Sequence, residues 1–323
     1  MRFIRLVLAS AMLLSAAPLK AEDAYPSRQV SVIVPFAAGG TADIFARIVA
    51  NYLQAKLGKP FVVENVGGAG SIVGVTRLAR SAPDGLTLGL ASTSALAINP
   101  SLYGQKLSYQ PDKDLQPVVQ ISVVPNVLVV NPDKIQARTM PDLIAYLKAN
   151  PDKVSFGSAG VGTSQHLAGE LFQQTTGTKM VHVPYKGSST MLTDLISGQI
   201  DLAFDNVPLL LPQAKDGKLA LIAAATPKRA SFDPNLPTVA EYLPGFEAVA
   251  WHGFFVPAAT PKPIVEKLSM EIRAFMQQPD TVQKMAELGA VAVALDSAPF
   301  AAYIASETER WKKVIEAANI KLE

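Results

Sequence analysis

Residues 30–58 read VSVIVPFAAGGTADIFARIVANYLQAKLG, and this stretch predicts the fold. Val30–Pro35 is a short, β-branched apolar run, which is typical of a buried parallel strand. The small residues that follow predict a tight turn, and we expect Thr41 to cap the next helix. Apolar residues then recur at helical spacing until Gly58, which favours a helix end. The stretch therefore predicts a strand–turn–helix unit.

Similar units follow along the chain. Pro60–Glu64 and Leu86–Ala91 are predicted strands, with a helix predicted over Ile72–Arg80 between them. Three such units in succession favour a parallel, Rossmann-like sheet. The pattern resumes with predicted strands at Val154–Gly157 and Leu202–Phe204, each close to further helical segments. The sequence thus predicts an α/β fold with two Rossmann-like lobes.

The division into lobes follows from two extended crossings, predicted near residues 120–130 and 220–255. We expect lobe 1 to comprise residues 22–125 and 226–323, and lobe 2 to comprise residues 126–225. Ligands of open α/β sheets bind beyond the carboxyl ends of the strands, and clefts between domains are favoured pockets. The cleft between the lobes is therefore the predicted site.

Composition narrows the classes of function. The 323 residues suffice for one large domain or two ordinary ones, and 49% of them are hydrophobic, as in a globular protein. Lys plus Arg number 29 against 27 Asp plus Glu, and no basic cluster occurs, so nucleic acid is not an expected partner. The chain has no cysteine, which excludes disulfides, thiolate metal sites, a cysteine nucleophile and a lipoprotein anchor.

The N-terminus has the layout of a secretory signal peptide. Arg2 and Arg5 precede an apolar stretch over Leu6–Ala17, which is shorter than the roughly 20 residues that a membrane span requires. We predict cleavage near Ala21, a signal peptide over residues 1–21 and a mature protein in the periplasm. A buried N-terminal helix is the alternative.

Three predicted strand-to-helix turns have little side-chain bulk: Ala37–Thr41, Gly67–Ser71 and Gly157–Ser164. Small residues let backbone N–H groups at a helix N-terminus approach an anion, which the helix dipole also favours. Alternatively, the glycines only permit tight turns. Opposed turns in two lobes favour the anion-binding interpretation.

Dinucleotide binding, metal binding and catalysis have weaker support in the sequence. Gly68, Gly70 and Gly74 resemble a dinucleotide fingerprint, but the third glycine falls one residue late. The histidines show no metal-ligand spacing, and no Gly-x-Ser-x-Gly elbow occurs, so we predict neither a metal, a cofactor nor catalytic residues. A periplasmic serine–histidine hydrolase remains a rival. Asp205, at the end of a predicted strand, either accepts a ligand hydrogen bond or orients loops.

Several motifs resemble one family. The stretch Pro35–Asp43, PFAAGGTAD, resembles the opening motif of Bug-type extracytoplasmic solute receptors of the tripartite tricarboxylate transporter system. Asn65–Ser71, Val183–Gly187, Phe204–Asn206 and Trp251–Pro257 are similar to later motifs of that family. The resemblance runs from about Tyr25 to the C-terminus, so it covers essentially the whole predicted mature chain.

The resemblance implies a type II periplasmic binding protein, or Venus flytrap, without catalytic activity. It implies that a ligand carboxylate is held by the first strand-to-helix turn and by the facing glycine-rich turn of lobe 2. The positions carried over are Phe36, Ala38, Gly40, Thr41 and Asp43 in lobe 1, and Ser158, Ala159, Gly160, Thr163, Ser164 and His166 in lobe 2. Asp205 corresponds to an acid that contacts ligand amino groups. Ser92, which opens a loop at the cleft, completes the expected ligand-binding set.

The resemblance further implies a ligand among di- and tricarboxylates, aromatic acids and acidic amino acids, and a partner among the integral-membrane permease subunits of a transporter. We expect a monomer. A sensor that reports ligand to a two-component signalling system is the alternative, since it would use the same clamp with a different partner.

Overall fold

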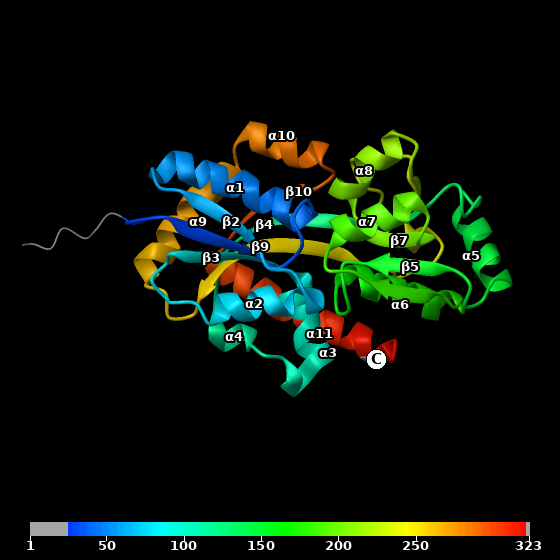
Figure 1. The fold of residues 1–323 in the computed structure, drawn as a ribbon, viewed down its shortest axis with the longest axis horizontal. Helices are drawn as coiled ribbons and strands as arrows, with labels where there is room; N and C mark the ends of the chain where they lie inside the picture. Colours follow the sequence, from blue (N-terminus) through cyan, green and yellow to red (C-terminus); the bar gives the residue numbers. More distant parts are fainter. Residues whose placement is uncertain (1–24, 321–323) are drawn as a thin grey trace, which may run out of the picture.

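The computed structural model describes residues 25–320, so the predicted signal peptide over residues 1–21 lies outside the described residues. Strands and helices alternate along most of the chain (Figure 1). The strands are β1 Val30–Val34, β2 Phe61–Asn65, β3 Thr87–Ser92, β4 Leu115–Val130, β5 Ser155–Ser158, β6 Val181–Pro184, β7 Leu202–Asn206, β8 Ala220–Ala224, β9 Val249–Pro257 and β10 Val291–Asp296. The α-helices are α1 Thr41–Leu57, α2 Ile72–Ala79, α3 Asn99–Tyr103, α4 Pro111–Asp114, α5 Met140–Ala149, α6 Ser164–Thr176, α7 Ser188–Ser197, α8 Val207–Lys215, α9 Lys262–Met276, α10 Pro279–Glu287 and α11 Ser297–Ala317.

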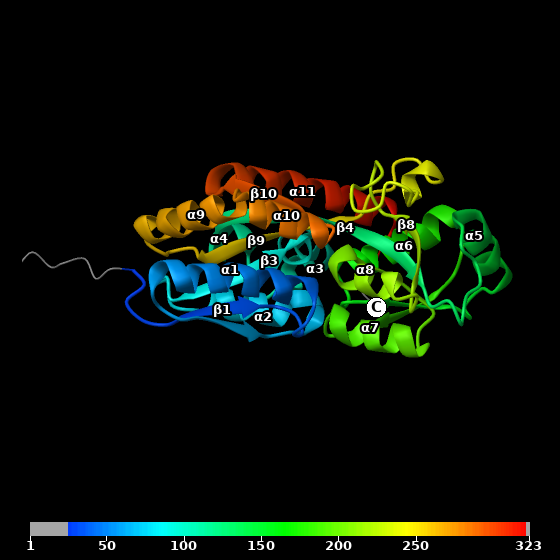
Figure 2. The same ribbon diagram turned by 90° about the horizontal axis from the view of Figure 1, so that it is seen from above.

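The strands form one curled sheet in the order β2-β1-β3-β9-β4-β7-β5-β6, with β8 and β10 also paired to β4. The predicted parallel arrangement is present: β1 pairs in parallel with β2 and β3, and β5 pairs in parallel with β6 and β7. The strand β4 lies in the middle of the sheet and belongs to both of its halves. Its first part pairs with β9 and its last part pairs with β7 and β8, so β4 connects two lobes (Figures 1 and 2).

A hydrophobic core covers each face of the sheet. Val30, Val32 and Val34 of β1 belong to the core beneath α1, α7, α8 and α9, whereas Ile33 belongs to the core on the opposite face. This alternation follows from the two-residue period of a strand. Because helices bury both faces, β1 is apolar at every position except Ser31, as expected for a parallel strand.

The start of α1 differs from the prediction. Gly40 is the N-cap and has no side chain to cap the helix, while Thr41 is already the first helical residue. The turn is closed by Asp43, whose Oδ2 accepts from the backbone N–H of Gly39 at 2.9 Å. No side chain caps α1, but the acid in its first turn fixes the preceding turn and lies where the helix dipole favours a negative charge. By contrast, Thr139 is the N-cap of α5, and its side chain accepts from the N–H of Asp142.

The extended crossing predicted near residues 120–130 is part of one long strand. β4 runs unbroken through Pro125 and Asn126. Pro125 has no N–H to donate, and it lies opposite Val249, the first residue of β9, where the pairing ends. Asn126 begins the pairing with β7. The change of partner, not a break in the strand, separates the lobes.

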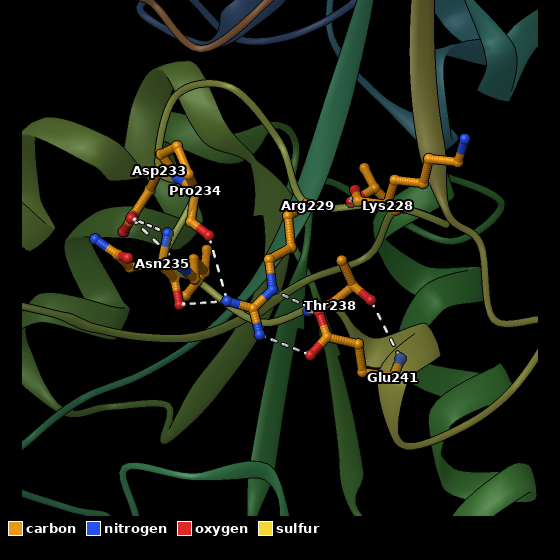
Figure 3. A network of polar contacts seen from close by, with 9 residues as sticks. Lys228, Arg229, Asp233, Pro234, Asn235, Thr238 and Glu241 are labelled. Carbon is orange, nitrogen blue, oxygen red and sulfur yellow. Dashed lines mark hydrogen bonds and ion pairs between the residues drawn. The ribbon is translucent and has the colours of Figure 1, made fainter.

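The return crossing between β8 and β9 has no strand of its own between residues 225 and 248. Arg229 holds this segment together: its guanidinium donates two hydrogen bonds of 2.8 Å to Glu241 (Figure 3). It also donates to the carbonyls of Pro234 and Asn235. Thr238 and Glu241 form a capping box, so the segment keeps a defined path although it lies at the surface.

Candidate functional site

A small cavity of about 20 Å³ lies where the two lobes meet. Phe36 follows β1 and Ser92 ends β3 on one side, while Ala159 follows β5 and Asn206 ends β7 on the other. The site therefore lies at the carboxyl ends of the parallel strands of both lobes, as predicted for this sheet type. Its lining comprises Phe36, Gly40, Thr41, Ala42, Ser92, Ser94, Ala159, Ser164, Gln165, Ser188, Asn206, Ala250 and His252.

Four helices begin at this cavity. Gly40 and Thr41 start α1, and Ser164 is the first residue of α6. Ser188 is the first residue of α7, and Asn206 is the N-cap of α8. The first backbone N–H groups of a helix lack partners within it, and the dipole places partial positive charge at the same end. Four such ends make the cavity suitable for an anion.

The lining itself is neutral. None of the described residues that line the cavity is an Asp, Glu, Lys or Arg. The hydroxyl of Thr41 is buried and has no hydrogen-bond partner within residues 25–320, although the residue lines the cavity. Because an unpaired buried hydroxyl costs free energy, a ligand oxygen that pairs with it would bind favourably.

Asp205 lies behind this lining. Its Oδ1 accepts from the Gln165 amide at 2.9 Å, from the Ser188 hydroxyl at 2.9 Å and from the Asn206 N–H at 2.7 Å. Its Oδ2 is buried without a partner among the described residues. Burial raises the pKa of Asp205 to about 6, although the three hydrogen bonds oppose the rise. Asp205 therefore orients lining residues from the lobe 2 side.

Other predicted residues brace the two turns. Asp43 accepts from Arg47 at 3.0 Å and from Asn65 at 2.9 Å; although burial acts to raise its pKa, hydrogen bonds from Arg47, Gly39 and Asn65 lower it. In lobe 2, the N-cap Thr163 donates to the carbonyl of Gly160 at 2.7 Å. Ser158 accepts from the Gly160 N–H at 3.1 Å. These contacts fix the loops that carry the helix N-termini.

His166 points elsewhere. It lines a second cavity of about 140 Å³ with His182, and the centroids of the two imidazole rings lie 4.2 Å apart. Burial lowers the pKa of His166 to about 4 and that of His182 to about 3, with His166 adding to the effect on His182. Within residues 25–320, no group of three or more His, Cys, Asp or Glu residues could hold a metal ion.

The structure thus brings part of the predicted set to the cavity. The predicted residues that line it are Phe36, Gly40, Thr41, Ser92, Ala159 and Ser164. Those that do not are Ala38, Asp43, Ser158, Gly160, Thr163, His166 and Asp205. The lining also includes residues outside the predicted ligand-binding set, namely Ala42, Ser94, Gln165, Ser188, Asn206, Ala250 and His252. Most of these lie within two residues of a strand end or a helix start, and that position is the signal that could have found them.

The glycine turn at Gly67–Ser71 also has a different role from the one predicted. It does not line the cavity but lies against lobe 2, where a Cβ on Gly70 would be 1.9 Å from the carbonyl oxygen of Val161. A Cβ on Gly67 would be 2.9 Å from the carbonyl oxygen of Lys186. Gly74 packs α2 onto β1, since its Cβ would be 2.7 Å from the Cα of Pro35. These glycines permit close packing of backbones.

Hydrogen bonds also join the lobes around the cavity. The Ser189 hydroxyl donates to the carbonyl of Ala38 at 2.7 Å, and the Ala37 N–H donates to the carbonyl of Lys186 at 3.3 Å. Near the cavity, the N–H of Ser164 donates to the Ser94 hydroxyl at 3.3 Å. The two lobes are therefore in direct contact near the small cavity.

Comparison with known sequences agrees with this geometry. The sequence model of the tripartite tricarboxylate transporter family receptor matches residues 45–320. The chain belongs to this family. The family is one of solute-binding receptors and not of enzymes, and its solved members are periplasmic binding proteins. Among residues 25–320 of the receptor, no helix has both the length and the apolar character needed to cross a bilayer.

Solved structures show the same fold. The periplasmic binding protein BugD is 34% identical to the receptor, with a TM-score of 0.88 over 93% of this chain and 100% of that chain. R. palustris Rpa4515 with adipate is 34% identical, with a TM-score of 0.89 over 92% and 99% of the two chains. MatC from Rhodopseudomonas palustris with bound malate is 31% identical, with a TM-score of 0.85 over 90% and 100%. The receptor is thus a two-lobed α/β binding protein.

Proposed function

We propose that this receptor captures a small carboxylate in the cavity between its lobes. The observation that carries the proposal is the convergence of four helix N-termini on a lining that has no charged side chain among the described residues. Such a lining offers backbone N–H groups and neutral hydroxyls to a carboxylate. Neutral donors avoid the cost of desolvating a cationic side chain, which an ion pair would incur.

The free energies of these interactions are large enough to bind a carboxylate. A carboxylate near one helix N-terminus gains roughly 0.3–1 kcal/mol at an exposed site and more where it is partly buried. Each hydrogen bond to a charged group contributes about 1.5–3 kcal/mol net. A few such bonds offset much of the free energy that association costs, which is several kcal/mol. No single strong ion pair is therefore needed.

The ligand class that we propose is a small dicarboxylate. Rpa4515 was solved with adipate and MatC with malate, and both chains share the fold of the receptor over nearly their whole length. Both ligands are dicarboxylates with short carbon chains. The Thr41 hydroxyl and the serines of the lining add polar contacts that suit oxygen-rich ligands.

Binding in this proposal involves separation and closure of the lobes. A cavity of about 20 Å³ holds roughly one water molecule, so a dicarboxylate requires a wider opening. We place the hinge where β4 changes partner near Pro125 and Asn126, and in the return crossing that ends at β9. Ligand then favours the closed population by its higher affinity for that state.

The remaining expectations belong to the same proposal. Lobe 1 would comprise residues 22–125 and 226–323, and lobe 2 residues 126–225. We propose a periplasmic, monomeric receptor without catalytic activity or a cofactor, with the signal peptide cleaved near Ala21. It would deliver its ligand to the integral-membrane permease subunits of a tripartite transporter.

The test is calorimetric titration with dicarboxylates and with their diamides, which have a similar shape but no charge. Dicarboxylates should bind and raise the melting temperature, since ligand at 100 times its Kd stabilises a protein by about 2.7 kcal/mol. Ala159→Asp, which places a carboxylate in the cavity, should abolish binding. Ala159→Asn is the matched control of nearly equal volume and should retain most of the affinity.

The proposal is wrong if the wild-type receptor binds no carboxylate, or if Ala159→Asp binds as tightly as Ala159→Asn. The melting temperatures of both variants without ligand show whether either is destabilised.

A further inference from the structure

The wall of the cavity formed by the sheet carries one imidazole. His252 of β9 lies opposite Ser92 of β3 in the antiparallel register, and both residues line the cavity. Ala250, two residues earlier on β9, also lines it, as the period of a strand requires. Trp251 points to the other face and packs edge-on against Phe300. Of the described lining residues, His252 alone has a titratable side chain.

The His252 ring is held in one orientation. Its Nδ1 lies 3.1 Å from the hydroxyl of Ser122 on the neighbouring strand β4. Phe45 of α1 packs against the ring in an edge-on arrangement, with the ring centroids 5.5 Å apart. The residue is only 3% exposed, and burial lowers its pKa to about 3. The imidazole is therefore neutral at physiological pH and cannot form an ion pair with an anion.

The hydrogen-bond network assigns the position of the ring proton. Ser122 is fully buried, and its hydroxyl has one hydrogen-bond partner within residues 25–320, namely Nδ1 of His252. If Nδ1 carried the proton, the buried Ser122 hydroxyl would have no acceptor, which is unfavourable. Ser122 therefore donates to Nδ1, and the proton of the neutral ring lies on Nε2.

His252 Nε2 has no hydrogen-bond partner among the described residues, and the ring borders the cavity. A neutral N–H of this kind can donate to a carboxylate, carbonyl or hydroxyl oxygen. It cannot accept from an ammonium group, because the other ring nitrogen is already occupied by Ser122.

We propose that His252 determines the specificity of the receptor by donating from Nε2 to a second oxygen-bearing group of the ligand. The inference rests on the proposed function, in which helix N-termini bind the first carboxylate. Ser122 is a positioning residue, since it acts by fixing the tautomer. The receptor should therefore prefer acids with a second oxygen function over simple monocarboxylates and over acids with an amino group at that place.

The test compares ligands that differ in one group: butanoate, succinate, 4-hydroxybutanoate and 4-aminobutanoate. Calorimetry on the wild-type receptor should give about tenfold tighter binding of succinate or 4-hydroxybutanoate than of butanoate. The two oxygen-bearing ligands show whether a carboxylate or a hydroxyl is preferred. 4-Aminobutanoate should show no gain over butanoate.

His252→Phe keeps an aromatic ring but removes the donor. This variant should lose the preference for the oxygen-bearing ligands over butanoate. His252→Gln, which restores an amide N–H, should recover part of the preference. If His252→Phe keeps the wild-type ratio, or weakens all ligands equally, the assignment of specificity to His252 is refuted.

A second measurement does not depend on any variant. Nitrogen-15 NMR of labelled histidine in the wild-type receptor reports which ring nitrogen carries the proton, and the shifts of Nε2 should indicate N–H. A proton on Nδ1 would overturn the inference. Failure of the wild-type receptor to bind any of the four acids would instead refute the proposed function itself.

Discussion

At the residue scale, Asp205 shows how burial sets a charge state. The carboxyl is completely buried, and this raises its pKa from 3.8 to about 6. Between these values the folded receptor binds more protons than the unfolded chain, so the free energy of unfolding contributed by Asp205 falls as pH rises. Above about pH 6, where Asp205 is ionised in the folded state as well, its burial lowers the free energy of unfolding by on the order of 3 kcal/mol.

Asp205→Asn removes this titration while its carbonyl can still accept from Gln165, Ser188 and Asn206. The variant should therefore gain stability relative to wild type by up to about 3 kcal/mol as pH rises from about 4 to about 7. Urea unfolding at a series of pH values measures the difference. A difference that stays constant with pH would show that the pKa of Asp205 is not raised in the folded state.

At the scale of elements, glycine turns form the contact between the lobes. Gly70 has φ 56° and a backbone so close to Val161 that a Cβ would overlap its carbonyl oxygen. Gly58, at the end of α1, has a similar φ of 71°, but within residues 25–320 no other atom lies within 4 Å of the position that its Cβ would take. The two glycines thus share a backbone conformation and differ in their surroundings.

Gly70→Ala should weaken ligand binding by about tenfold or more, because the added methyl group holds the lobes apart and lowers the closed population. Gly58→Ala should cost about 1 kcal/mol of stability for its left-handed backbone and leave the Kd unchanged. Calorimetry and urea unfolding distinguish the two effects. Equal affinities for the two variants would mean that the contact at Gly70 is not part of the closed state.

At the scale of the whole molecule, the proposed motion can be tested with a cross-link. A Cβ on Gly39 in lobe 1 would lie 3.7 Å from the Cβ of Ser189 in lobe 2, which is within the range for a disulfide. Because the chain has no cysteine, the variant Gly39→Cys with Ser189→Cys can form no other bridge within the chain.

Oxidation of this double variant should lock the lobes together and stop ligand exchange. Ligand added after oxidation should not enter, and ligand bound before oxidation should not leave; reduction should restore both rates. Stopped-flow or filter-binding measurements give these rates, with each single cysteine variant as a control. Normal exchange in the oxidised protein would show that ligand enters without separation of the lobes.

Much of the fold could be predicted because its signals are local. The apolar run of β1 and the helical spacing of α1 depend on periods of two and 3.6 residues, which the sequence displays directly. The antiparallel strands β9 and β10 were harder to predict. Their pairing with β4 joins residues that are far apart in the chain, and no periodic pattern in the local sequence indicates such a pairing.

Prediction of the site was partial for the same reason. The sequence by itself determined the small turn residues, the approximate positions of the helix starts and the absence of cysteine, because these depend on residue type and local spacing. The tertiary structure alone decided that His252 borders the cavity, that Asp205 lies behind it and that His166 points away. The physical reason is that the strand register and the contact between the lobes determine which side chains border the cavity. Both depend on interactions between segments that are far apart in the sequence.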